Sequence, residues 1–94
     1  MIITTGSATI RPVHFDAVLK LGVEHSARSR GEPGCIAHNC HVDAEDPQRI
    51  VFIEEWADMA PLCRPGVGGI CAALGDWADG TPAMKIYAAE EVGQ

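Results

Sequence analysis

The spacing of hydrophobic positions divides the chain into strand-like and helix-like segments. Residues 2–10 alternate apolar and small polar side chains and stop at Arg11-Pro12, which predicts a first strand closed by proline. From Pro12 onward, apolar or small residues recur at helical intervals, which predicts an amphipathic helix that ends between Ser29 and Gly31. The stripe that should face the core consists of Phe15, Val18, Leu19, Gly22 and Ser26.

The second strand is predicted over residues 35–43, after the turn at Glu32-Pro33-Gly34. Strict alternation would place one set of its side chains on a single face: Ile36, His38, Cys40 and Val42. An acidic loop over residues 44–47 then leads to a third strand over residues 50–56.

A second helix is predicted between Asp58, which can cap it, and Trp77 or Ala78. Turn residues follow at 79–82, and residues 83–89 read as a fourth strand. The order βαββαβ predicts one α+β domain over residues 1–94, a ferredoxin-like four-stranded antiparallel sheet with helices on one face. Residues 90–94 are expected to form a short tail or an arm.

Both faces of the third strand carry large apolar groups, with Phe52 and Trp56 on one side and Val51 and Ile53 on the other. A single layer of helices covers only one side of a sheet, so the second side needs another surface. The sequence therefore predicts a homodimer in which two sheets face each other, a dimeric α/β barrel.

Composition narrows the classes of partner. The formal net charge is -6 and the chain has only seven Lys and Arg, which argues against nucleic acid and anionic membranes as partners. No apolar run reaches the roughly 18 residues of a membrane-spanning helix, and the first residues lack the features of a signal peptide. We therefore expect a cytoplasmic protein whose four cysteines are reduced thiols.

Several motifs in the first two thirds of the chain resemble one known family. They are Glu24-His25-Ser26 with the Pro33-Gly34 turn, Asp46-Pro47, the strand 50–56 with its Glu-x-Trp ending, and residues 57–60 after it. Together they resemble the antibiotic biosynthesis monooxygenase (ABM) family of quinol monooxygenase-like proteins. The order of elements matches that family over nearly the whole chain.

The resemblance implies oxygenation of a quinol-like or polycyclic aromatic molecule in an apolar pocket, without a cofactor. Such a reaction needs a base and donors that hold an oxyanion. The resemblance leaves two alternatives open: a non-catalytic ligand-binding or stress-associated dimer of the same fold, and an isomerase of a small carbonyl compound. Many relatives carry two histidines in the segment that corresponds to residues 62–70, and this chain has neither.

Histidine is the natural base near neutral pH, and His38 and His25 are the candidate catalytic residues. His38 lies in the middle of a predicted strand, and His25 belongs to the motif shared with the family. The candidate residues for binding the substrate are Trp56, Glu54, Arg64, Trp77 and Tyr87. No metal site is predicted, because alternation sends His41 to the opposite face from His38 and Cys40.

Overall fold

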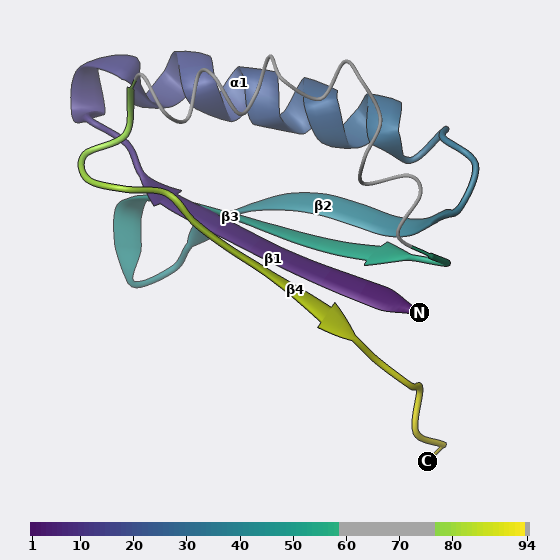
Figure 1. Cartoon of the computed structure of the whole chain (residues 1–94). Helices are drawn as coiled ribbons and strands as arrows, with labels where there is room; N and C mark the ends of the chain where they lie inside the picture. Colours follow the sequence, from purple (N-terminus) through teal and green to yellow (C-terminus); the bar gives the residue numbers. More distant parts are fainter. Residues whose placement is uncertain (59–76, 94) are drawn as a thin grey trace.

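A four-stranded antiparallel sheet with a long helix against it makes up residues 1–58 and 77–93, the part of the chain that the computed structural model describes (Figure 1). The strands lie in the order β2-β3-β1-β4, which is the ferredoxin-like order. The elements are β1 (Ile2–Thr9), α1 (Pro12–Ser29), β2 (Cys35–Asp43), β3 (Asp46–Trp56) and β4 (Ala83–Ala88). The predicted α+β fold is confirmed, whereas nearly all of the predicted second helix lies outside the described residues.

The turn between β2 and β3 is shorter than the sequence suggested. Asp43 pairs with Asp46, so only Ala44 and Glu45 form the turn, and β3 begins at Asp46 instead of residue 50. The carboxylate of Asp43 holds this turn, because it accepts a hydrogen bond from the Glu45 backbone N–H at 2.8 Å and contacts Arg49 at 2.9 Å. The backbone N–H and Arg49 lower the pKa of Asp43.

Strict alternation in β2 is wrong at Ile36. Cys35 pairs with Trp56 and Ala37 with Glu55, so Ile36 is the extra residue of a β-bulge. Its side chain is 57% exposed, whereas His38, which was predicted to share its face, is 1% exposed. A bulge inserts one residue into one strand, and the period-two pattern of the sequence gives no sign of it.

The core lies between α1 and the inner face of the sheet. Its buried members are Ala8, Ile10, Val18, Ile50, Phe52 and Ala78. Gly22 sets how closely the helix approaches, because a Cβ at this position would lie 2.9 Å from Cζ of Phe52 and 3.0 Å from Sγ of Cys40. A residue with a side chain cannot occupy this position unless the helix or these side chains move.

Gly22→Ala is therefore expected to destabilise the fold. Overpacking costs about 1–3 kcal/mol, which outweighs the roughly 1 kcal/mol gained when alanine replaces glycine in a helix. Urea denaturation should show a net loss of about 1 kcal/mol. Gly31→Ala is the control, because a Cβ there meets only the Arg28 carbonyl oxygen at 3.5 Å. Equal stability of the two variants would contradict the close approach at Gly22.

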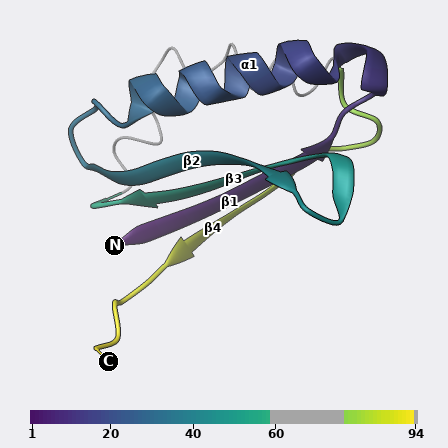
Figure 2. The same ribbon diagram turned by 180° about the vertical axis from the view of Figure 1, so that it is seen from behind.

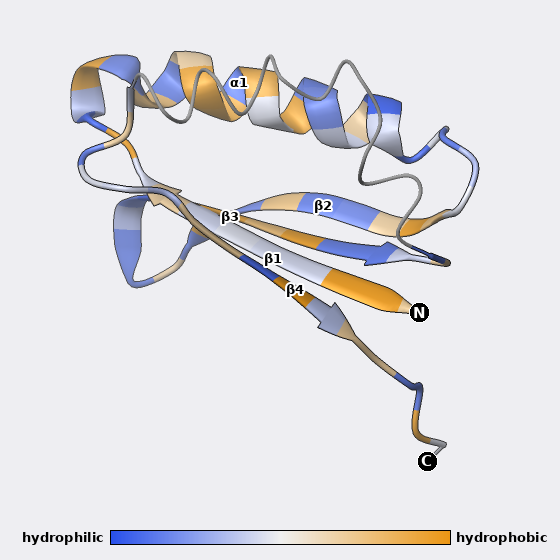
Figure 3. Cartoon of the chain, viewed as in Figure 1, coloured by the Kyte–Doolittle hydropathy of each residue, from blue (hydrophilic) through white to orange (hydrophobic). Residues whose placement is uncertain are grey.

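The outer face of the sheet is covered by none of the described elements. Figures 1 and 2 show α1 on one side of the sheet only, in both views. On the outer face, Ile53 is 45% exposed and Tyr87 is 47% exposed. Figure 3 shows hydrophobic colour on the strands as well as along α1. The sheet therefore has apolar groups on both sides, as the pattern of residues 50–56 indicated.

Candidate functional site

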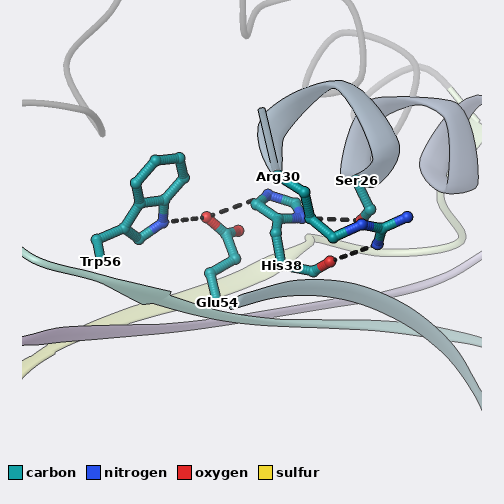
Figure 4. A network of polar contacts seen from close by, with 5 residues as sticks. All are labelled: Ser26, Arg30, His38, Glu54 and Trp56. Carbon is teal, nitrogen blue, oxygen red and sulfur yellow. Dashed lines mark hydrogen bonds and ion pairs between the residues drawn. The ribbon is translucent and has the colours of Figure 1, made fainter. Parts of the chain in front are cut away.

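A chain of polar contacts lies between the C-terminal half of α1 and the inner face of the sheet (Figure 4). Ser26 belongs to α1, His38 is in the middle of β2, and Glu54 and Trp56 end β3. Strand register brings them together, because His38 pairs directly with Glu54. Arg30, just after α1, donates a hydrogen bond to the His38 carbonyl oxygen at 2.8 Å and fastens the end of the helix to β2.

Both ring nitrogens of His38 are engaged. Nδ1 lies 2.8 Å from Oγ of Ser26, and Nε2 lies 3.3 Å from Oε1 of Glu54. An ionised carboxylate only accepts hydrogen bonds, so in the neutral ring the proton is on Nε2 and the Ser26 hydroxyl donates to Nδ1. Ser26 is 2% exposed, so the arrangement is a buried polar network and not an exposed serine nucleophile.

Glu54 is the centre of this network. The indole N–H of Trp56 donates to Oε1 at 2.9 Å, and the same oxygen faces His38. Burial alone would raise the pKa of Glu54, but the contacts with His38 and Trp56 hold that pKa below its ordinary value. The carboxyl group is therefore ionised at neutral pH, and its other oxygen, Oε2, makes no hydrogen bond to the described residues.

His25 lies beside the network without joining it. Its ring packs edge-on against His38 at 5.0 Å and against Phe52 at 6.2 Å between centroids. Within the described part of the chain, the imidazole makes no hydrogen bond. Burial lowers the pKa of His25, and the neighbouring His38 lowers it further. His25 is therefore a neutral imidazole at pH 7, able to accept a proton.

The other predicted binding residues lie away from this network. Tyr87 pairs with Ile3, on the opposite face of the sheet from Trp56. Trp77 stacks on His14 at 5.2 Å, near the start of α1, and His14 is eleven residues or roughly 16 Å along the helix from His25. Arg64 lies outside the described residues. The structure thus joins His38, Glu54 and Trp56, with His25 alongside.

Sequence reasoning missed two polar groups of this region. Ser26 was read as a residue of the inner stripe of the helix and of the family motif, but no partner was sought for its hydroxyl, which needs one when it is buried. Thr4 was read as part of an alternating strand, yet it is completely buried on the inner face and its hydroxyl has no hydrogen-bond partner among the described residues. A search for polar residues in phase with apolar ones would have marked both.

In residues 1–58 and 77–93, no three His, Cys, Asp or Glu side chains are grouped so that they could hold a metal ion. None of the helices described is long and apolar enough to cross a membrane.

The comparison with protein families agrees with the motifs and the fold. The model of the antibiotic biosynthesis monooxygenase (ABM) family matches residues 1–63, which contain every member of the polar network. The chain belongs to the ABM family. No match was found among curated proteins.

Solved structures extend the likeness of this ABM protein beyond residue 63. A crystal structure of an antibiotic biosynthesis monooxygenase is 28% identical, with a TM-score of 0.84 over 97% of this chain and 100% of that one. A Deinococcus radiodurans protein, proposed to be such a monooxygenase, is 23% identical with a TM-score of 0.90, over 100% and 97% of the two chains. Rv0793 of Mycobacterium tuberculosis is 18% identical with a TM-score of 0.86, over 99% and 98%. The last two likenesses show the shared fold.

Proposed function

We propose that this ABM-family protein is a cytoplasmic, homodimeric monooxygenase that oxidises a quinol-like or polycyclic aromatic small molecule without a cofactor. The observation that carries the proposal is His25, a neutral imidazole that makes no hydrogen bond to the described residues and lies beside an ordered polar network. Family membership supports the reaction class.

His25 is better suited than His38 to act as the base. His38 is 1% exposed and has both ring nitrogens engaged, so it cannot take a proton from a substrate unless it breaks a contact. His25 is 9% exposed and has a lowered pKa, which keeps its ring ready to accept a proton. In this proposal His38 is a positioning residue, because its ring packs against that of His25.

The chemistry requires little beyond this base and an apolar setting. His25 takes a proton from the substrate, which leaves an electron-rich phenolate or carbanion. A ring carbon then forms a C–O bond with O₂, and the substrate supplies the electrons. Cleavage of the O–O bond with loss of water leaves a carbonyl group, so one O₂ gives one product oxygen and one water. The rings of Phe52 and Trp56 supply apolar surface nearby.

The homodimer is proposed from the outer face of the sheet. Ile53 and Tyr87 are about half exposed there, and neither α1 nor another described element covers them. Apolar groups on a sheet face that faces water favour self-association, and a small domain gains burial from it. A second copy of the chain presents the same face, which is what a two-fold interface requires.

Oxygen uptake tests the reaction. With an anthrone or a hydroquinone under air, the parent protein is expected to consume one O₂ per product, and His25→Ala should lower the rate about 10²-fold or more. His41→Ala is the control, because His41 is an exposed histidine in β2 and should leave the rate unchanged. His38→Ala should lower the rate less than His25→Ala does. Uptake equal to that of buffer would contradict the proposal.

The pH profile gives a second check on His25. Because the pKa of His25 is lowered from 6.5, its base form persists at pH 6.5, and the rate should fall only at more acidic pH. The acid limb should be missing from the residual rate of His25→Ala. A limb unchanged in that variant would assign the base to another group.

A ligand-binding dimer is the second candidate. It is favoured by residues 62–70, where many relatives carry histidines and this chain has none. It predicts that aromatic ligands bind although no oxygen is consumed.

A further inference from the structure

The buried hydroxyl of Thr4 is the strongest feature that the proposed reaction does not use. Thr4 is 0% exposed, and its Oγ1 is buried without a hydrogen-bond partner, the one such side-chain atom among the described residues. A buried donor without a partner is costly, and native proteins leave few of them. Such a group calls for an explanation, and a ligand atom that completes its hydrogen bond is one.

Strand register places Thr4 directly opposite Glu54 on the inner face of the sheet. Thr4 pairs with Glu54 across β1 and β3, and Glu54 pairs with His38 across β3 and β2. Directly paired residues have Cβ atoms about 4.5–5.5 Å apart on the same face of the sheet. The contacts of Glu54 with His38 and Trp56, drawn in Figure 4, both involve its Oε1 atom. Its other oxygen, Oε2, has no partner among the described residues.

Next to Thr4 on the inner face of β1, the position of Gly6 has no side chain. Gly6 is two residues from Thr4 on the same face of β1 and pairs with Phe52. Among the described residues, the atom nearest to a Cβ built at Gly6 would be 3.8 Å away, so the packing of these residues does not force glycine there. Glycine inside a strand often marks a place where a ligand comes close to the backbone. Part of the Glu54 side chain is accessible to solvent, because it is 13% exposed.

We infer that Thr4 and Glu54 together bind a hydroxyl group of an aromatic ligand whose ring lies over Gly6. The ligand hydroxyl donates its proton to Oε2 of Glu54, and the oxygen of that ligand hydroxyl accepts a hydrogen bond from Oγ1 of Thr4. One hydroxyl thus satisfies both groups, whereas a methyl ether satisfies only Thr4. The inference rests on the proposed function for its ligand class, and it concerns a hydroxyl other than the one deprotonated by His25.

Thr4→Val separates this role from a structural one, because valine keeps the shape and removes the hydroxyl. The probe is 1-naphthol, which is stable in air, titrated into the full-length protein and followed by NMR. Thr4→Val should weaken its binding about tenfold, the effect of one lost hydrogen bond, while Thr4→Ser should bind within about threefold of the parent. The parent should bind 1-methoxynaphthalene about tenfold more weakly than 1-naphthol, because the ether cannot donate to Glu54.

Thr4→Val should weaken ligand binding but should raise the thermal stability of the ligand-free protein. Removing a buried hydroxyl that has no partner should raise the Tm of Thr4→Val by about 4 °C. Thr5→Val is the matched control on the outer face, and it should leave naphthol binding unchanged. Gly6→Val should fold and should weaken naphthol binding, because its side chain takes the place of the ring.

Each other result decides against the inference or against the reaction. Naphthol binding equal in Thr4→Val and the parent would overturn the inference and leave oxygenation untouched. The same equality with a lowered Tm would mean that water satisfies Thr4 in the folded protein. A parent that binds no naphthol would also overturn the inference. Absent oxygen uptake with Thr4-dependent naphthol binding would overturn the proposed reaction and keep the binding site.

Discussion

Glu54→Ala is expected to lower the free energy of unfolding by about 3 kcal/mol, because it leaves two buried donors without an acceptor. One donor is the indole N–H of Trp56, which is 2.9 Å from Oε1 of Glu54, and the other is Nε2–H of His38 at 3.3 Å. Trp56 is 3% exposed and His38 1%, so water cannot take the place of the carboxylate without rearrangement. For a domain whose total stability is about 5–15 kcal/mol, this is a large loss.

Glu45→Ala is the control for this loss, since Glu45 is exposed in the turn before β3 and, among the described residues, forms a hydrogen bond only through its backbone N–H. Urea denaturation at pH 7 and one fixed protein concentration measures both variants, because association would make stability depend on concentration. Glu54→Ala as stable as Glu45→Ala would show that the network adds nothing to the fold.

Glu54 should also give stability a definite pH dependence. Its pKa in the folded chain is below the ordinary value of 4.5, so unfolding takes up a proton between the two values. The contribution is complete above pH 4.5 and is lost as pH falls through the folded pKa. Glu54→Gln, which keeps an acceptor for Trp56, should therefore lose less stability than the parent below pH 4.5. Parallel curves for the two proteins in that range would contradict the assignment.

Hydrophobic periodicity was sufficient to predict the elements that are described. It placed α1 and β2 at their observed bounds and ended β1 and β4 one residue late. It began β3 four residues late, since Asp46-Pro47 reads as loop although Asp46 already pairs with Asp43. The pairing of β1 with β3 ends at Arg49, so Pro47 has no partner in β1. Proline lacks a backbone N–H, and it is tolerated here because no hydrogen bond to β1 is needed from it.

The candidate site could be predicted only in part. Alternation correctly put His38 and Cys40 on one face of their strand, and Phe52 and Trp56 together on one face of theirs. It could not show that these faces coincide, because the relative register of two strands depends on the turn and the bulge between them. Nor could alternation give the partners of Glu54, which are His38 and Trp56. A buried carboxylate needs donors but does not need a full ion pair.

The polar network and the proposed dimer interface involve opposite faces of β3. Glu54 and Trp56 on the inner face belong to the polar network, whereas Val51 and Ile53 on the outer face pair with residues of β2 outside that network. Changes on the outer face should therefore alter association without altering the network. That separation makes the dimer testable independently of the reaction.

Ile53→Asp is expected to convert the proposed dimer into a monomer. Ile53 is 45% exposed on the outer face and pairs with Thr5 of β1 and Asn39 of β2, neither of which can neutralise a carboxylate. Burying an unpaired charge in an interface costs at least about 3 kcal/mol, which raises the dissociation constant more than a hundredfold. Light scattering at micromolar concentration should give twice the chain mass of 10.0 kDa for the parent and 10.0 kDa for the variant.

Val23→Asp is the matched control, because Val23 is 50% exposed on α1 and faces away from the sheet surface at issue. It should keep the parent's mass, and circular dichroism should show that both variants are folded. A parent of 10.0 kDa, or an Ile53→Asp variant that keeps the dimer mass, would contradict the interface. Glu54→Gln can also be introduced into the Ile53→Asp variant. If that variant is a folded monomer, and Glu54→Gln changes its stability below pH 4.5 as it does in the parent, the polar network of the inner face does not depend on the dimer.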